Sequence, residues 1–274
     1  MDLQEDKHLS TKKAIAKKAI IGGTGVYDAQ RLKNSEQQTM ETPFGKTVYT
    51  LGEYGGDTVV FLPRHGEGHH LPPHQVPYRA NLYALRELGV TEIYATAAVG
   101  SVHKNLPPGS LVVVDQFLDF TKSRPVTFFE DGNPVTHVDM TDPFCGRLRK
   151  KLAKSAAEQS LPIVYGGTYV CTEGPRFETS AEIRMFDRMG GDVVGMTAVP
   201  EVVLAKELGM CYASVAMVTN YCSGITGDVL THQEVLDVMS ENVHRIRDLF
   251  FHTLLAPDPD ESCTCRTAAH AMNA

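Results

Sequence analysis

The sequence predicts a single α/β domain, and three observations support this fold class. The chain has 274 residues, of which 42% are hydrophobic and 22% charged, as in an ordinary globular protein with a full core. Short Val- and Ile-rich runs, typical of buried strands, alternate with amphipathic helix-like segments. The longest apolar runs fall far short of the ~20 residues that a membrane span needs, and residues 1–10 do not resemble a signal peptide. We therefore expect a cytoplasmic protein without a membrane partner.

Charge and cysteine spacing argue against two further classes of function. A net charge of -7 and a pI near 5.9 disfavour a nucleic-acid partner, because binding to a phosphate backbone needs a basic face. The six cysteines, at positions 145, 171, 211, 222, 263 and 265, show neither a CxxC pair nor Cys/His zinc spacing, so we expect no metal site. Four of them are expected to be reduced, mostly buried thiols. Residues 1–17 are predicted to be a flexible tail, residues 18–256 the domain, and residues 257–274 a C-terminal tail with a CxC pair.

The domain should begin with a short buried strand at residues 19–21, followed by a glycine-rich turn that contains Thr24. The bare backbone of such a turn can approach an anion. The alternative is a turn with no ligand, because glycine turns that only end a first strand are common. The turn lacks the third glycine of a dinucleotide fingerprint and the Lys-Ser/Thr of a P-loop. Residues 47–62 are predicted to form a β-hairpin that leads to Arg64 and His65, where a guanidinium and an imidazole could hold an anion.

Four imidazoles follow one another closely in this segment: His65, His69, His70 and His74. A metal site is the alternative, but neither HExxH spacing nor a carboxylate cluster accompanies them, so contacts with phosphate and sugar are favoured. Next come a helix from Pro77 to about Gly89, a strand over residues 92–101 that contains Ala97 and Ala98, and a second strand over residues 110–117.

A long irregular stretch, residues 121–141, contains Arg124 and His137, and segments of this kind often meet a partner subunit. Asp142 is predicted to cap the helix that follows. After the next strand, the sequence Glu-Gly-Pro-Arg-Phe-Glu at residues 173–178 interrupts the pattern. If Phe177 lies against a planar ligand and Glu178 reaches its edge, the two would recognise a heterocycle; the alternative is a core Phe and a surface Glu.

The last third of the chain adds a helix at residues 181–189 and a strand at residues 192–195 that leads to Met196 and Thr197. Since a helix starts at Pro200, Thr197 would bring a hydroxyl and free backbone donors to a helix N-terminus that favours anions. A strand over residues 210–219 ends at Asn220, at the edge where α/β folds hold ligands. A capping box at residues 231–234 is predicted to begin the final helix, which runs to about residue 255.

Taken together, these motifs resemble the trimeric nucleoside phosphorylases, which include purine nucleoside phosphorylase and methylthioadenosine phosphorylase. The resemblance spans nearly the whole chain: IGGTG at 21–25, PRHGEGH at 63–69, ATAAVGS at 95–101, EGPRFET at 173–179, GMTAVPE at 195–201 and VTN at 218–220. It implies a single-domain, three-layer α/β/α fold with a mixed, partly barrel-like central sheet. It also implies reversible phosphorolysis of a purine nucleoside, without a cofactor or metal and with inorganic phosphate as co-substrate, in a homotrimer or alternatively a hexamer.

The resemblance also assigns roles to residues. Asn220, Thr197 and Arg64 would be the catalytic groups. Phosphate would lie among Thr24, Arg64, His65, Ala97, Ala98 and Thr197, although relatives of the methylthioadenosine type place a hydroxyl at the position of Ala97. The nucleoside would contact Phe177, Glu178, Met196, Asn220, Cys222, His232 and His69, together with His137 from the adjacent subunit.

Three of these positions predict the substrate. A carboxylate at Glu178 accepts the N1 hydrogen of a 6-oxopurine and repels the N1 lone pair of adenine, while adenine-specific relatives place Asp at the position of Asn220. His232 corresponds to a His that binds the 5'-hydroxyl, although a partly exposed histidine is the alternative. The sequence therefore predicts an enzyme for inosine and guanosine, with 5'-methylthioinosine phosphorylase, methylthioadenosine phosphorylase and an inactive nucleoside-binding protein as alternatives. Some archaeal relatives close the CxC pair into a disulfide; we expect free thiols here.

Overall fold

The structure is a computed structural model that describes residues 14–23, 26, 31–130, 135–227, 232–259 and 262–271. For residues 232–234 and 270–271 it describes the backbone alone.

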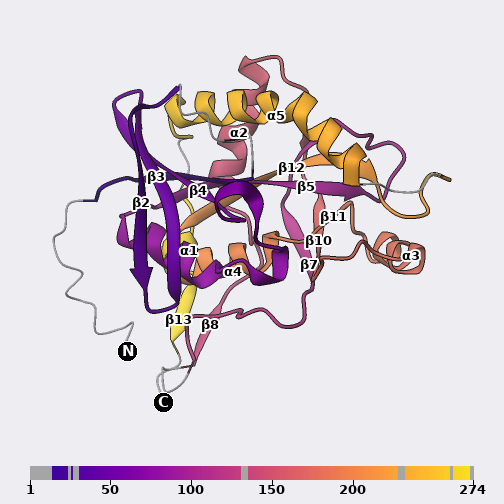
Figure 1. Ribbon diagram of the computed structural model, residues 1–274, viewed down its shortest axis with the longest axis horizontal. Coiled ribbons are helices and arrows are strands. Elements are labelled where there is room, and N and C mark those ends of the chain that lie inside the picture. Colours follow the sequence, from indigo (N-terminus) through magenta and orange to yellow (C-terminus); the bar gives the residue numbers. More distant parts are fainter. Residues whose placement is uncertain are drawn as a thin grey trace.

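Eleven strands of the described chain form one mixed sheet (Figure 1). Its main path runs through β2 (Lys33–Thr42), β3 (Gly45–Tyr54), β4 (Asp57–Pro63), β1 (Lys18–Gly22), β5 (Glu92–Ser101), β11 (Val193–Gly195), β10 (Thr168–Thr172) and β7 (Gln116–Phe120). A branch leaves β5 through β12 (Cys211–Tyr221) to β6 (Leu111–Val113) and β9 (Val164–Tyr165). The sheet is mixed, as predicted, and its path does not close into a complete barrel.

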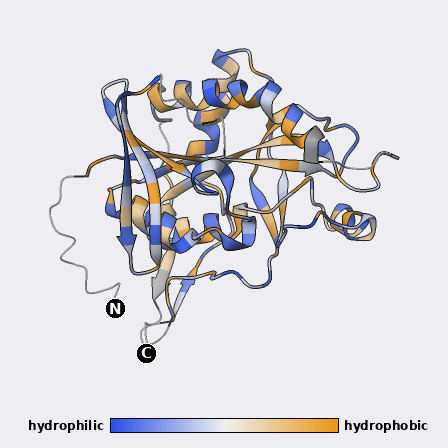
Figure 2. Ribbon diagram, viewed as in Figure 1, coloured by the Kyte–Doolittle hydropathy of each residue, from blue (hydrophilic) through white to orange (hydrophobic). Residues whose placement is uncertain are grey.

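Helices cover both faces of the sheet and give the predicted three layers. Successive strand residues face opposite sides, and Ile20 accordingly packs into a different core from Ile21. The core around Ile21 includes α1 and α4, and the core around Ile20 includes α2 and α5. The helices are α1 (Tyr78–Glu87), α2 (Gly146–Glu158), α3 (Ser180–Arg188), α4 (Ala198–Glu207) and α5 (His232–Leu255). Figure 2 shows both hydrophobic and hydrophilic residues along α1, α2 and α5, as amphipathic helices on a sheet require.

Most elements lie where the sequence predicted them, and local chemistry explains their limits. The hairpin at residues 47–62 is confirmed as the antiparallel pair β3 and β4. Helix α3 begins with a capping box, in which Thr179 accepts from the Glu182 backbone and the Glu182 carboxylate accepts from the Thr179 backbone. Helix α4 includes Val199 at φ -110° and ψ 131°, so regular helical geometry starts at Pro200, as predicted.

The strand predicted over residues 110–117 and the helix cap predicted at Asp142 are not found. Residues 110–117 do not form one strand, because β6 pairs with β12 whereas β7 pairs with β10. Between β6 and β7, the Asp115 amide donates to the Gly167 carbonyl. Asp142 does not cap a helix, because α2 begins later, with Cys145 at its N-cap. The Asp142 carbonyl instead accepts a hydrogen bond from Lys206.

The segments at the two ends of the described chain both contact the domain. Ala16 is buried, and its amide donates to the Leu88 carbonyl. Near the C-terminus, β13 (Ala269–Ala271) pairs antiparallel with β8 (Thr136–Val138), which lies within the stretch predicted to be irregular. The C-terminal segment is thus packed onto the domain over residues 262–271. None of the described helices is at once long enough and apolar enough to cross a bilayer.

Candidate active site

The sheet branches at β5, and a cavity opens beside the branch. Strand β1 pairs with β5 as far as Ala95, and β11 pairs with it at Gly100 and Ser101. On the edge of β5 that pairs with β1 and β11, no described strand pairs with residues 96–99. These four residues line a cavity of about 750 Å³. Of the residues singled out from the sequence, those that line this cavity are Arg64, His65, His69, His70, Ala97, Ala98, Phe177, Glu178, Met196, Thr197, Asn220 and Cys222.

Arg64 is held in the cavity wall by a buried carboxylate. Its Nε and Nη2 donate to the two carboxylate oxygens of Glu201 at 2.7 Å each, and its Nη1 donates to the Thr96 carbonyl at 2.7 Å. The Tyr212 hydroxyl donates to the same carboxylate at 2.7 Å. Burial alone would lower the pKa of Arg64, but Glu201 raises it overall, so the side chain stays cationic. These bonds use three of its five N–H groups and leave two for a ligand.

His65, next to Arg64, has its ring orientation set by the backbone. Its Nδ1 lies 2.8 Å from the Leu71 carbonyl, and because a carbonyl can only accept, Nδ1 carries the proton. Burial, followed by the charge of Arg64, lowers the pKa of His65 to about 4. At neutral pH its Nε2 therefore offers a lone pair, so it could accept from a protonated phosphate oxygen. The ring donor that the sequence led us to expect for an anion is already used.

Thr197 presents a buried hydroxyl to the same cavity. Its Oγ1 has no hydrogen-bond partner within the described part of the chain, and an unpaired buried hydroxyl costs about 1–3 kcal/mol. Two of the backbone donors predicted to be free at this helix N-terminus are already hydrogen-bonded. The Thr197 amide donates to the Tyr169 hydroxyl, and the Val199 amide donates to Cys171 Sγ. The hydroxyl itself is therefore the group that Thr197 offers to a ligand.

Two polar side chains in the cavity are oriented by neighbouring threonines. The Thr172 hydroxyl donates to Glu178 Oε1 at 2.6 Å, and burial raises the pKa of Glu178 although this bond acts against the increase. Asn220 Oδ1 accepts from the Thr219 hydroxyl at 2.9 Å, while its Nδ2 donates to the Tyr221 carbonyl at 2.9 Å. These partners assign the amide orientation and leave one Nδ2 hydrogen for a ligand.

The space around these polar groups is apolar and closely fitted. Phe177 lines the cavity and is 41% exposed, so its ring is available to a planar ligand. Gly100 leaves room for its neighbours, because a Cβ at this position would lie 2.6 Å from Cys222 Sγ and 3.0 Å from Asn220 Nδ2. The His65 and His69 rings stack with their centroids 4.2 Å apart.

Arg124 joins two segments of the cavity wall from behind. Its Nη1 donates to the carbonyls of Met196 and Val199 at 2.7 Å, and its Nη2 donates to the carbonyls of Thr172 and Glu173 at 3.2 and 2.7 Å. This buried guanidinium therefore holds the segment before Glu178 against the segment around Thr197. We regard Arg124 as a positioning residue, since it does not line the cavity itself.

The sequence profile of the phosphorylase superfamily matches residues 17–255, which is most of the chain. The chain belongs to the phosphorylase superfamily. The family predicted from the sequence motifs is therefore confirmed.

Three similar proteins illustrate the range within this superfamily. The chain is 51% identical to a probable 6-oxopurine nucleoside phosphorylase of Dictyoglomus turgidum over 251 residues, or 91% of this chain and 95% of that protein. It is 48% identical to a probable S-methyl-5'-thioinosine phosphorylase of Methanothermobacter thermautotrophicus over 251 residues, or 91% and 87%. A crystal structure of methylthioadenosine phosphorylase from an antarctic soil metagenomic library superposes with a TM-score of 0.86 at 38% identity, covering 93% of this chain and 91% of that one.

Three of the predicted site residues are not placed in the cavity of this phosphorylase. Thr24 lies outside the described residues, and so does the side chain of His232 at the start of α5. His137 lies on β8, is exposed, and does not line the cavity of its own chain. Its predicted contribution to an adjacent subunit stays a prediction, as do the ligand contacts of the residues that line the cavity.

Sequence analysis assigned no role to Glu201 or Arg124, which hold Arg64 and the cavity wall in place. A signal for Glu201 was present, because a single carboxylate in the apolar run AVPEVVLA at residues 198–205 must be paired when that helix is buried. Arg124 was noticed without a role. Its carbonyl partners lie 48 to 75 residues further along the chain, and no local pattern indicates such contacts.

Proposed function

We propose that this phosphorylase cleaves 6-oxopurine nucleosides, inosine and guanosine, with inorganic phosphate to give the free base and ribose 1-phosphate. The observation that carries the proposal is that Glu178 and Asn220 line one cavity, each oriented by a neighbouring threonine hydroxyl. The enzyme would act in the cytoplasm in purine salvage and need no cofactor or metal for catalysis.

The two side chains select for the base by complementary hydrogen bonding. The Glu178 carboxylate accepts from the N1 hydrogen of a 6-oxopurine, whereas adenine brings a lone pair to that position. The free Nδ2 hydrogen of Asn220 is available to N7 of the purine. A repelled or unpaired buried polar group costs about 1–3 kcal/mol, so the two positions together would discriminate about a hundredfold or more between the bases.

Catalysis would follow from charge placement around the ribose. Cleavage of the glycosidic bond leaves a ribose with oxocarbenium character and a purine that gains negative charge. Phosphate held by Arg64, Thr197 and the backbone at residues 97–98 would stabilise the cationic ribose and attack it. A hydrogen bond from Asn220 to N7 would stabilise the departing base, so positioning and electrostatics supply the rate enhancement.

The cavity of one chain would be completed in a homotrimer or hexamer. The exposed position of His137 on β8 supports this proposal, because the side chain is available to a neighbouring subunit. In that assembly Met196 would lie under the ribose, Phe177 against the purine and His69 near the sugar.

A second candidate is 5'-methylthioinosine phosphorylase, and one observation favours it. Near its N-terminus α5 lines the cavity with Val235, Leu236 and Met239, an apolar surface suited to a methylthio group. His232, in the first turn of the same helix, would instead offer a hydrogen bond to a 5'-hydroxyl.

A substrate panel tests both candidates. We expect phosphate-dependent cleavage of inosine and guanosine. Adenosine, 5'-methylthioinosine and 5'-methylthioadenosine should be cleaved more slowly than these two. Absent or phosphate-independent cleavage would overturn phosphorolysis, and a preference for adenosine would overturn the role of Glu178. His232→Leu should shift the preference from inosine towards methylthioinosine, and Leu236→Ala should shift it the other way if α5 lines the 5' pocket.

A further inference from the structure

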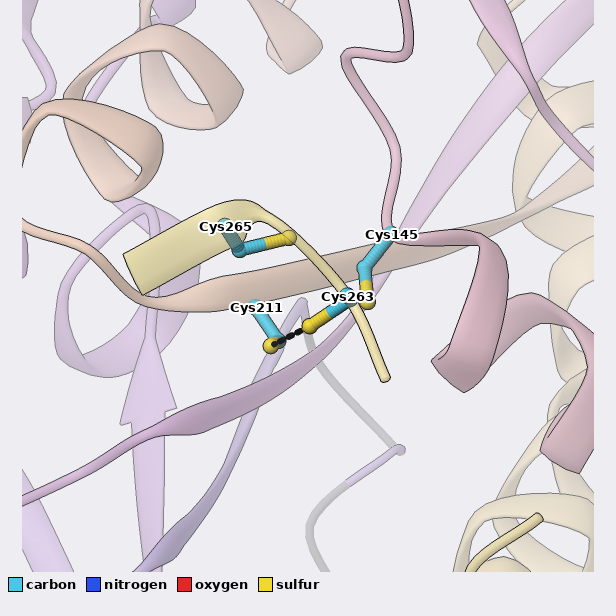
Figure 3. A group of neighbouring side chains, drawn as sticks. All are labelled: Cys145, Cys211, Cys263 and Cys265. Atoms are coloured by element: carbon cyan, nitrogen blue, oxygen red, sulfur yellow. Dashed lines mark hydrogen bonds between the residues drawn. The ribbon is translucent and has the colours of Figure 1, made fainter. Parts of the chain in front are cut away.

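Four of the six cysteines meet on the side of the sheet covered by α2 and α5. The Sγ atoms of Cys145, Cys211, Cys263 and Cys265 all lie within 4.8 Å of one another (Figure 3). Three of these residues are buried and Cys263 is partly buried. None of them lines the cavity described above. The thiols thus form a separate cluster with its own chemistry.

The cluster joins three segments that are distant in sequence. Cys145 is the N-cap residue of α2, and Cys211 is the first residue of β12. Cys263 and Cys265 come from the C-terminal segment, next to a short 3-10 helix (Cys265–Thr267). This separation explains why the sequence showed no zinc spacing and why we expected no metal site.

The spacing of the sulfur atoms fits a tetrahedral metal ion. Four thiolates bound to Zn²⁺ at about 2.3 Å lie about 3.8 Å from one another. Here Cys211 and Cys263 are 3.4 Å apart, and all six separations stay within 4.8 Å, so shifts below about 1 Å would complete the coordination. A disulfide joins sulfurs in pairs and does not require all six separations to be short. A bridge within the CxC pair would also be strained.

The surroundings offer partial compensation for the charge of such a site. On binding Zn²⁺ the four thiols release four protons to solvent, and the resulting tetrathiolate site has a net charge of minus two. Arg147 Nη2 lies 3.6 Å from Cys211 Sγ, and Cys145 lies at the positive end of the α2 dipole. Glu92 and Asp258 bind the same guanidinium at 2.7 and 3.1 Å, and Lys151 pairs with Asp258 at 2.7 Å.

We propose that Cys145, Cys211, Cys263 and Cys265 bind one Zn²⁺ in a closed, structural site that fastens the C-terminal segment to α2 and β12. Four sulfur ligands leave no open position for substrate, so the ion would have no part in the chemistry of the cavity. The fastened segment includes β13, which pairs with β8 and there places His270 opposite His137. The site would therefore also steady the strand that carries His137.

Metal analysis of the full chain, purified anaerobically with reductant, tests the proposal. We expect about one Zn²⁺ per chain, a loss of most of it in the double variant Cys263→Ser/Cys265→Ser, and full retention in the control Cys171→Ala, which removes a thiol outside the cluster. Zinc should also protect four thiols from Ellman's reagent and slow amide exchange in residues 262–271. Less than about 0.1 Zn²⁺ per chain after reconstitution, with all thiols reactive, would overturn the proposal.

Cobalt substitution of the wild-type protein decides the matter if the double variant does not fold. Co²⁺ in the site should give the intense sulfur-to-metal charge-transfer bands of a tetrahedral thiolate complex, which ions bound to the histidines at positions 65–74 would not give. Absence of these bands would refute the site. A mass deficit of four hydrogens, together with failure of the reduced protein to bind zinc, would show that the cluster is a pair of disulfides instead.

Discussion

Replacing Glu201 by Gln should expose the link between the buried ion pair and the phosphate site. The Glu201 and Arg64 side chains are 0% and 2% exposed and are joined by two hydrogen bonds of 2.7 Å. Removing one charge of a buried pair costs about 3–5 kcal/mol, because the other is left uncompensated. For a protein of this size that corresponds to a fall in Tm on the order of 10 °C.

Adding phosphate should raise the Tm of Glu201→Gln by more than it raises the Tm of the wild-type protein. A ligand at about 100 times its Kd stabilises the folded state by about 2.7 kcal/mol, and a dianion beside an uncompensated Arg64 gains additional Coulomb energy. The assay is thermal unfolding with and without saturating phosphate. The sample without phosphate contains a chloride salt at the same ionic strength and no sulfate.

Tyr212→Phe is the matched control for this experiment. It removes a hydrogen bond of 2.7 Å to the same carboxylate but keeps both charges, so it should cost about 1.5–3 kcal/mol and leave the phosphate response unchanged. If phosphate raises the Tm of Glu201→Gln no more than that of the wild type, Arg64 does not face the phosphate site and the assignment fails.

Three further predictions concern other parts of the site. Because burial raises the pKa of Glu178, KM for inosine should increase as the pH falls through that raised pKa, and Glu178→Gln should abolish this dependence in steady-state kinetics. The pKa of His65 is about 4 in the folded protein and 6.5 in the unfolded chain. About 3 kcal/mol of folding stability is therefore present above pH 6.5 and should be lost as the pH falls towards 4. Urea unfolding at pH 6.5 and at pH 4 should show a smaller loss for His65→Asn than for the wild type. In Arg124→Lys one ammonium cannot reach the carbonyls of both Met196 and Glu173, so KM for the nucleoside should increase more than Kd for phosphate, as kinetics and calorimetry can show.

Most of the elements and most of the cavity residues could be predicted from the sequence. Strand and helix limits depend on local chemistry, such as the capping box at Thr179 and the proline at position 200, and a single chain shows these directly. The motifs with Arg64, Glu178 and Asn220 could be found because Arg64 and Glu178 come after a strand and Asn220 lies at the end of one, where α/β folds place ligands. Register and strand order were out of reach, so the split of residues 110–117 into β6 and β7 was missed.

The pairing of these groups became visible only in the folded structure. Arg64 is paired with Glu201, 137 residues away, and the ring donor of His65 is used by the Leu71 carbonyl. Four scattered cysteines became a cluster because α2, β12 and the C-terminal segment converge on one face of the sheet. Composition and spacing report on neighbours along the chain, whereas hydrogen bonds, ion pairs and metal ligands depend on distances in space, and these are set when the sheet assembles.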